Sequence, residues 1–292
     1  MLHHDQPPEV KLTRGLQAFL AYLLLERNRT HPREVLAGLF WGDQDEEHAR
    51  SCLSTALWRL RRVLEPEGVP PGTYLIAHPT GSVGFNCQSD FWLDVAVFEE
   101  RASRPLAHPS QALTAAEIEA LEQVLPLYTG DLLEGIYADW ALRERERLRC
   151  LYLNSLACLM RYYRRHGICD KGLDCGHKIL QLDPLREEIH REMMQLYLDS
   201  DQRALAVQQY EACRRILAEE LGIAPLEETQ LLYTRIGPHP HPPTAPSLVS
   251  EDATLLEQTQ YQLHSTLRAL DHASEQVRHA IHTLEQTLRP PG

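Results

Sequence analysis

The residues best suited to chemistry on a partner molecule lie in one stretch, DEEHARSCLSTALWRLRRVL at 45–64. Its leucines are spaced by four, three and four, which predicts one buried stripe of an α-helix: Leu53, Leu57, Leu60 and Leu64. The opposite side of this helix carries hydrogen-bond donors, with an indole at the margin: Ser51, Thr55, Arg59, Arg62 and Trp58. Guanidinium and hydroxyl groups are donors that contact the base edges and phosphates of DNA. Because such helices also occur as plain solvated surfaces, the interpretation depends on the elements that position this one.

Two shorter helices are expected ahead of this stretch. The first covers 12–27 and has these core positions: Leu16, Phe19, Leu20, Leu23 and Leu24. The second covers 33–41, with Thr30 as its expected N-cap and Pro32 in its first turn. The residues of the second helix expected to face inward are Val35, Leu36, Leu39 and Phe40.

A β-hairpin is expected after the 45–64 helix. Beyond 66–72 the apolar residues change from a helical to an alternating pattern, and 74–77 and 83–85 flank a turn at 79–82. Three helices followed by a hairpin is the order of elements in a winged helix. In that fold the third helix docks in the major groove and the hairpin reaches the flanking backbone, so the order favours DNA recognition by 45–64.

The second half of the chain contains an internal repeat. Similar residues recur 34 positions apart within 127–236: Met160 with Met194, Tyr163 with Tyr197, Gly172 with Ala206, Leu173 with Val207, and Leu182 with Ile216. This period predicts tetratricopeptide-like helix pairs, stacked as a solenoid with a groove for protein partners. Gly172 and Ala206 are expected where paired helices approach closely, and the alternating run Arg143–Arg147 is interpreted as a solvated helix face. A connecting helical segment is expected over 99–126.

The composition is typical of a globular chain of about two domains: 292 residues, 43% hydrophobic and 24% charged. No apolar run approaches the ~18 residues of a membrane span, and the first residues lack the features of a signal peptide. Seven scattered cysteines without a CxxC pair indicate a reduced, cytoplasmic protein. The net charge is −12, and 1–98, 99–126, 127–236 and 237–292 each carry three more acidic than basic residues. Any DNA contact must therefore come from a local basic patch.

Motifs for catalysis are missing from the sequence, which contains no P-loop, GxSxG or HExxH. Cys169, Cys175 and His177 lie close together, but their spacing is not a usual zinc spacing, and we expect them to be helix-packing residues. No enzyme activity, catalytic residue, metal or cofactor is therefore expected.

The last part of the sequence combines a linker with a heptad pattern. Five prolines within 237–250 predict a stiff linker. Beyond it, over 251–289, apolar residues follow an a/d pattern: Leu256, Leu263, Leu267, Leu270, Val277, Ile281, Leu284 and Leu288. This pattern predicts a coiled coil that forms a homodimer or joins a partner, and the alternative is a helix that folds back on the solenoid.

Three motifs mark the first part of the chain: LFWGD at 39–43, LWRLRRVL at 57–64 and DVAVF at 94–98. They resemble the OmpR-type winged helix of the SARP family of bacterial transcriptional activators, the AfsR/DnrI group. YTGDLLEG at 128–135, DPLREEIHREMMQLY at 183–197 and LAEELGIAPLEET at 217–229 are similar to the bacterial transcriptional activator domain that follows it. The resemblance implies a dimer on direct repeats in promoter DNA, with a helical-repeat domain that contacts RNA polymerase or another protein.

We therefore expect a mainly α fold with four parts. These are a winged-helix domain with a small β-hairpin wing at 1–98, a tetratricopeptide-like solenoid at 99–236, the Pro-rich linker at 237–250 and a coiled-coil-like helix at 251–289. The expected function is sequence-specific DNA binding in transcriptional activation. The residues expected at base edges or nearby phosphates are Ser51, Thr55, Arg59 and Arg62, with Trp58 as a DNA-binding residue at their margin. Those expected at the DNA backbone are Arg50, Arg61, Thr80 and Ser82.

The alternative function is that of an adaptor whose winged helix and repeats contact proteins rather than DNA. The acidic balance of every segment favours it. So does the short stretch Met1–Lys11, because the family's winged helix has a small β-sheet ahead of its first helix and only 9–12 is strand-like here. Arg59 and Arg62, on the side away from the leucine stripe, favour DNA binding instead.

Overall fold

The structure, a computed structural model, describes residues 12–78, 81–107 and 113–237. Within these ranges the chain forms ten α-helices, one 3-10 helix and three short strands, and the predicted mainly α fold is confirmed. The predicted helix at 251–289 and residues 238–250 of the predicted linker lie outside the described residues. The buried side chains form two clusters, one in the first helices and strands and one in the later helices.

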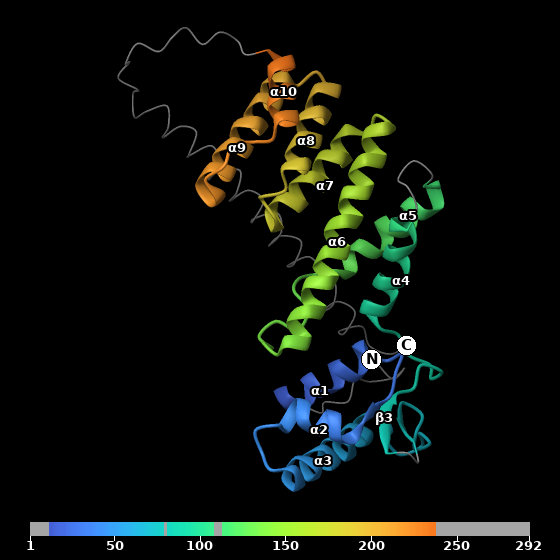
Figure 1. Cartoon of the computed structure of the whole chain (residues 1–292). Coiled ribbons are helices and arrows are strands. Elements are labelled where there is room, and N and C mark those ends of the chain that lie inside the picture. The colour runs from blue at the N-terminus through green and yellow to red at the C-terminus, as the bar shows by residue number, and fades with distance from the viewer. Residues whose placement is uncertain (1–11, 79–80, 108–112, 238–292) are drawn as a thin grey trace, which may run out of the picture. The chain divides into compact units, whose positions relative to one another are not determined.

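The first part of the described chain has the elements of a winged helix (Figure 1). In order they are α1 (Arg14–Leu25), β1 (His31–Pro32), α2 (Arg33–Trp41), α3 (Glu46–Leu64), β2 (Leu75–Ala77) and β3 (Ser82–Phe85). The predicted hairpin is confirmed as the antiparallel pair β2–β3, with Leu75 opposite Phe85.

Strand β1 is not predicted by the sequence pattern. His31 pairs with Val83 and Pro32 with Ser82, which gives a sheet of order β1-β3-β2. The predicted N-cap at Thr30 is wrong, because the chain is extended through β1 and Pro32 occupies the N-cap position of α2 without a side-chain hydrogen bond.

Helix α3 forms as its sequence predicts. The Asp45 carboxylate caps it by accepting a hydrogen bond from the His48 N–H at 3.0 Å. The predicted stripe is buried: Leu53, Leu57, Leu60 and Leu64. It shares a core with Phe19 and Leu23 of α1 and Leu36 of α2, so one side of α3 is fixed by packing.

Helix α2 buries a different stripe from the predicted one. Leu36 and Ala37 are buried, and Phe40 packs against the same cluster. Val35 and Leu39 are 52% and 44% exposed, so the prediction that they face the core is wrong. Val35 and Leu39 are four residues apart, so both lie on the side of α2 next to its buried side. Because the core covers α2 on one side only, this neighbouring side stays in solvent.

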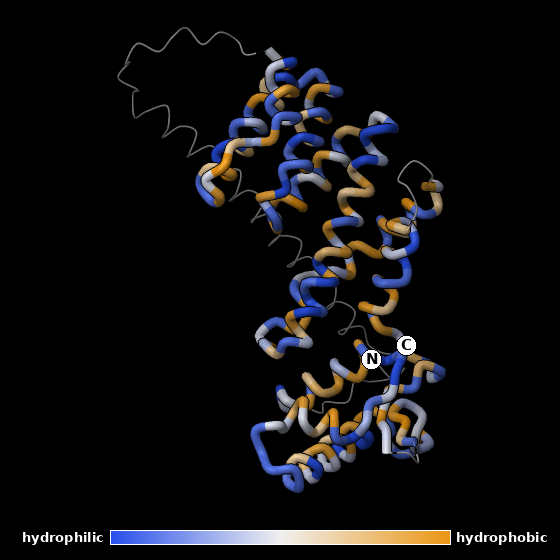
Figure 2. Tube along the Cα trace, in the orientation of Figure 1, coloured by the Kyte–Doolittle hydropathy of each residue, from blue (hydrophilic) through white to orange (hydrophobic). Residues whose placement is uncertain are grey.

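The second part of the described chain is wholly helical. Its elements are α4 (Asp94–Leu106), α5 (Ala115–Val124), η1 (Leu125–Leu127), α6 (Asp139–Arg165), α7 (Cys169–Leu182), α8 (Glu187–Asp199), α9 (Arg203–Leu221) and α10 (Glu227–Ile236). Helix α4 runs across the predicted domain boundary at 98/99 and packs against α5 and α6. Along the chain α6 packs on α7, α7 on α8 and α8 on α9. Figure 2 shows hydrophobic and hydrophilic segments alternating along these helices, as expected when each is covered on one side.

The 34-residue repeat is visible in the packing of α6 to α9. Met160 in α6 and Met194 in α8 are both fully buried, and Gly172 in α7 and Ala206 in α9 are buried as well. A Cβ at Gly172 would lie 3.0 Å from Leu196 Cδ1, so a small residue is needed where α7 approaches α8.

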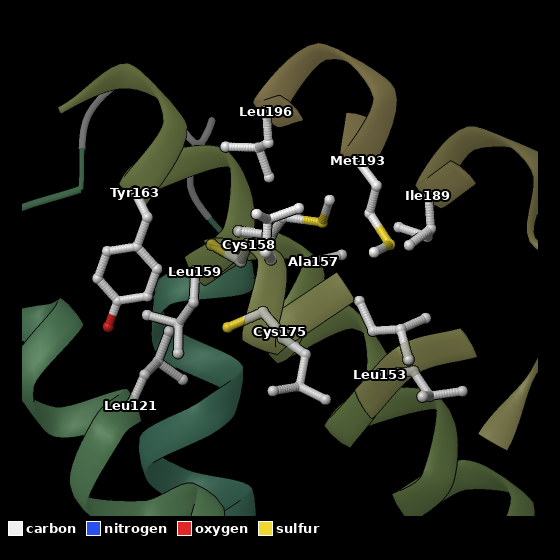
Figure 3. Packing of buried hydrophobic residues seen from close by; sticks show 14 of the residues in the cluster. Leu121, Leu153, Ala157, Cys158, Leu159, Tyr163, Cys175, Ile189, Met193 and Leu196 are labelled. Atoms are coloured by element: carbon white, nitrogen blue, oxygen red, sulfur yellow. The ribbon is translucent and has the colours of Figure 1, made fainter. Parts of the chain in front are cut away.

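Gly176 makes a closer approach that the sequence pattern did not indicate. A Cβ there would lie 2.7 Å from Cγ of Met193 on α8. Figure 3 shows Met193, Ile189 and Leu196 of α8 directed into this core. The two glycines, one turn apart, therefore let α7 and α8 pack with little separation.

Candidate nucleic-acid interface

One side of α3 is exposed and carries the residues predicted to contact DNA. All five are exposed, and they define the α3 face: Ser51, Thr55, Trp58, Arg59 and Arg62. They lie opposite the buried leucine stripe because successive residues of an α-helix are about 100° apart. The structure thus brings the predicted group together on one surface, with the Trp58 indole 57% exposed.

The arginines of α3 differ in their ion pairing. Within the part of the chain that the structure describes, Arg59, Arg61 and Arg62 have no carboxylate partner. The Arg62 guanidinium lies over the Trp58 ring, 5.1 Å from its centroid, in a cation–π contact. Arg50 is instead paired with Glu46 at 2.5 Å, although such an exposed pair contributes little and is screened by salt. Three guanidinium groups can therefore approach an anion without first losing an ion pair.

Two hollows flank the α3 face on the side of α1. One, of about 330 Å³, is lined partly by Ser51, Thr55 and Arg59, and the other, of about 430 Å³, partly by Trp58 and Arg62. Every lining residue of both hollows is neutral or basic. The surroundings of the α3 face are thus electrostatically suited to a polyanion, although the whole chain is acidic.

The predicted wing residues are only partly described. Ser82 begins β3 and is half-buried, whereas Thr80 lies outside the described residues. The His78 N–H donates to the Ser82 carbonyl at 2.8 Å, and the Gly81 N–H donates to the His78 carbonyl at 2.9 Å. Gly81 has a φ of 85°, which glycine adopts without steric cost, so the turn closes at this residue. Contact of the wing with DNA stays a prediction.

Glu65 joins the wing to the end of α3. Its carboxylate accepts hydrogen bonds from the backbone N–H groups of Tyr74 at 2.9 Å, Leu75 at 3.0 Å and Gly72 at 3.1 Å. Three N–H donors on one carboxylate fix the start of β2 relative to α3. Sequence reasoning missed this residue, and its only local signal is an acid between the helix and Pro66.

Arg33 is a second residue that sequence reasoning missed. It begins α2, and its Nη2 donates to the Ser54 hydroxyl of α3 at 2.8 Å. Its backbone N–H donates to the Gly81 carbonyl of the wing at 3.3 Å. Arg33 thus places a cation where α2, α3 and the wing meet, beside the α3 face.

The side of the winged helix away from α3 is covered by the start of α6. Trp140 and Ala141 are buried in the cluster of the winged helix rather than in that of the repeats. The Trp140 ring centroid lies 5.2 Å from that of Tyr22 and 6.1 Å from that of Phe40. The Arg14 guanidinium also donates to the Gly135 carbonyl just ahead of α6. Residues of the repeat part therefore complete the winged-helix core.

Polar contacts join the same two parts. Arg27, two residues beyond α1, pairs with Glu99 of α4 at 2.8 Å, with side chains only 13% and 19% exposed. Arg147 of α6 pairs with the other oxygen of Glu99. Within the second part itself, Arg145 of α6 donates to the backbone carbonyls of 132, 133 and 136. The prediction that the run Arg143–Arg147 is simply a solvated face is therefore wrong for Arg145, which is half-buried on these carbonyls, whereas Arg147 is exposed.

The two cysteines of α7, Cys169 and Cys175, pack in or against the hydrophobic core of the repeats. Cys175 is buried, and burial raises the pKa of its thiol to about 11. Among the residues that the structure describes, no group of three metal-ligating side chains is found. The helices in the described ranges are too short or too polar to span a membrane.

Comparison with known proteins finds similarity to transcriptional regulators. Residues 93–237 match the family model described as bacterial transcriptional activator domain. Regulatory protein AfsR of Streptomyces coelicolor is 28% identical over 220 residues, and transcriptional regulatory protein MoaR1 of Mycobacterium tuberculosis is 28% identical over 230 residues. Residues 93–237 belong to the family of bacterial transcriptional activator domains, and the chain resembles SARP-type regulators. Each alignment covers 75% of this chain, which spans 22% of the length of AfsR and 71% of that of MoaR1.

A solved structure has the same fold. Mycobacterium tuberculosis EmbR, in complex with a low-affinity phosphopeptide, matches with a TM-score of 0.65 at 20% sequence identity. The match covers 77% of this chain and 59% of the EmbR chain. The order of winged helix and helical repeats is therefore shared with a structure of distant sequence.

Proposed function

We propose that this chain is a transcriptional activator that binds double-stranded DNA sequence-specifically. Helix α3 enters the major groove and the wing contacts the flanking backbone. The observation that carries the proposal is the α3 face, where Arg59 and Arg62 have no carboxylate partner in the described chain. The opposite side of the same helix is held in a packed core, so these side chains are presented from a rigid element.

The proposed contacts follow from the chemistry of each side chain. Arg59 and Arg62 read guanine, whose O6 and N7 accept two hydrogen bonds from one guanidinium. Ser51 and Thr55 hydrogen-bond to base edges or nearby phosphates, and Trp58 supplies apolar contact at the margin. The residues assigned to the DNA backbone are Arg50, Arg61, Thr80 and Ser82.

The proposed partners follow from the family resemblance and the heptad pattern. The chain forms a homodimer through 251–289 and binds direct repeats in promoter DNA. Its helical repeats contact RNA polymerase or another protein, since solenoids present extended surfaces to partners. The proposal places this activity in the cytoplasm and assigns the chain no enzymatic reaction.

Selection of random double-stranded DNA by the full chain tests DNA recognition. The expected result is an enriched motif, present as a tandem repeat, whose affinity falls steeply as salt rises because phosphate contacts release counterions. Arg59→Glu should abolish enrichment. Arg215→Glu is the matched control, because Arg215 is an exposed arginine of α9 without an ion pair in the described ranges. Failure of the folded wild-type chain to enrich any motif overturns the proposal.

Sedimentation tests the proposed dimer separately. Deletion of 251–292 should reduce the measured mass from that of a dimer to that of a monomer. An unchanged mass after deletion overturns the assignment of the dimer contact to the heptad residues, and leaves the DNA-binding proposal to its own test.

The charge balance supports a second candidate function, that of an adaptor without DNA binding. The net charge of −12 is spread over all segments of the chain and opposes approach to a polyanion. This candidate predicts that the folded chain enriches no DNA motif and that Arg59→Glu changes nothing in the selection.

A further inference from the structure

A groove of about 420 Å³ lies in the helical repeats, between α5, α6 and α7, and the proposed function does not use it. Its floor is the side of α6 that carries Tyr152, Leu156 and Leu159. Figure 3 shows Leu121, Leu159, Tyr163 and Cys175 gathered in this part of the core. The groove combines leucine and tyrosine side chains with four charged ones, and concave sites of this size that join apolar surface to convergent polar groups can hold small molecules.

One wall of the groove is aromatic. The rings of Tyr128 and Tyr152 are stacked, with centroids 4.3 Å apart and an angle of 14° between their planes. The Tyr128 hydroxyl faces Asp131, whereas the Tyr152 hydroxyl has no hydrogen-bond partner in the described ranges. Burial raises the pKa of Tyr152, so this phenol is neutral at pH 7. The wall therefore offers aromatic surface with a neutral hydroxyl beside it.

Four charged side chains line the groove, and two of them neutralise each other. The Glu122 carboxylate of α5 accepts hydrogen bonds from Lys171 Nζ of α7 at 2.7 Å and from the Tyr163 hydroxyl of α6. The hydrogen bond from Lys171, followed by that from Tyr163, holds the pKa of Glu122 below its ordinary value. Glu122 and Lys171 thus tie α5 to α7 at the groove and add no net charge.

The other two charged residues, Asp174 and Lys178, lie one helical turn apart on α7. An acid four residues ahead of a lysine is the arrangement that commonly pairs on a helix. Asp174 and Lys178 do not pair with each other, and neither has another ion-pair partner within the described chain. The groove therefore presents one unpaired anion and one unpaired cation beside an aromatic wall.

We propose that this groove binds a small molecule with a flat aromatic body and a head that carries both an ammonium and a carboxylate. The aromatic body stacks on the wall formed by Tyr128 and Tyr152. The carboxylate of the ligand forms an ion pair with Lys178, and its ammonium forms an ion pair with Asp174. This site is independent of the α3 face and of DNA binding.

Calorimetric titration of the full chain with four probes that share an indole ring tests the proposal. L-Tryptophan carries both charges, L-tryptophanamide only the ammonium, indole-3-propionate only the carboxylate, and indole neither. We expect L-tryptophan to bind at least about tenfold more tightly than each of the other three. Absence of binding by all four, or a single-charge probe or indole that binds as tightly as L-tryptophan, overturns the proposal.

Substitutions then assign the two charges. Lys178→Met should abolish the tighter binding of L-tryptophan relative to L-tryptophanamide. Asp174→Asn should abolish its tighter binding relative to indole-3-propionate. Both residues are exposed, so the variants should fold, which thermal unfolding verifies. Arg215→Met on α9 is the matched control and should leave all four affinities unchanged. A preference that survives both groove substitutions contradicts the proposed site.

Discussion

Trp140, the second residue of α6, lies edge-on to Tyr22 of α1, with ring centroids 5.2 Å apart and an angle of 79° between the planes. Trp140 is 7% exposed and belongs to the winged-helix cluster, although its helix continues into the repeats. The same helix forms the floor of the groove further along, at Tyr152 and Leu156. α6 is therefore one continuous element shared by the two cores.

Trp140→Ala should destabilise the winged helix as well as the repeats. Loss of a buried indole leaves a cavity, and such changes typically cost about 3–5 kcal/mol in the free energy of unfolding. Urea denaturation measures the total, and amide hydrogen exchange should show reduced protection in α1 and α2. Tyr137→Ala is the control, because Tyr137 is 76% exposed and should contribute little. Unchanged exchange in α1 and α2 would mean that Trp140 does not support the winged helix.

Arg59→Ala should weaken binding to the selected DNA site by about 1–3 kcal/mol and relax the preference at one base pair. The reason is the loss of a bidentate contact to a base edge. Arg61→Ala should weaken binding to all sequences alike and lower the slope of log affinity against log salt by about one. Fluorescence anisotropy over a salt series distinguishes the two. Equal effects of Arg59→Ala on selected and random DNA would assign Arg59 to the backbone instead.

Glu65→Ala should loosen the wing while leaving α3 intact. Three backbone N–H groups lose their acceptor, and hydrogen bonds to a charged group contribute about 1.5–3 kcal/mol each at most. We expect a fall in the free energy of unfolding of a few kcal/mol and weaker DNA binding, with circular dichroism unchanged. Glu67→Ala is the control, since Glu67 is exposed and has no partner in the described ranges. Wild-type stability in the Glu65 variant would show that these bonds are replaced by water.

His190 should make stability depend on pH. Its ring is buried, with Nε2 3.0 Å from the Pro184 carbonyl and Nδ1 2.6 Å from Gln209 Nε2. Burial lowers the pKa of His190 below its ordinary value of 6.5. Because the folded pKa is the lower one, protons bind the unfolded chain preferentially. The free energy of unfolding therefore falls as pH drops below about 6.5 towards the folded pKa.

Urea denaturation from about pH 7.5 to 5.5 measures this dependence. His190→Gln should flatten the fall without abolishing it, because burial also lowers the pKa of His31. His48→Gln, at an exposed position, should follow the wild-type profile. A wild-type pH profile in the His190 variant would exclude His190 as the titrating group.

Much of the fold could be predicted from patterns within single elements. The four leucines of α3 repeat at helical spacing, so the buried stripe and the opposite α3 face follow from the geometry of one helix. The hairpin follows from alternation, and the paired helices follow from the period of 34 residues. Strand β1 could not be predicted, because two residues are too few to show a pattern.

The contacts between elements were decided by the tertiary structure alone. Periodicity shows which side of a helix is buried but not what covers it, so the place of Trp140 in the winged-helix core had no signal in the sequence. The alternating charges around Arg145 look solvated in sequence, yet Arg145 donates to three backbone carbonyls. Arg14 and Gly135, which also meet, are 121 positions apart. The helices, the repeat and the α3 face follow from local sequence patterns, whereas the contacts between winged helix and repeats depend on long-range packing that no local pattern encodes.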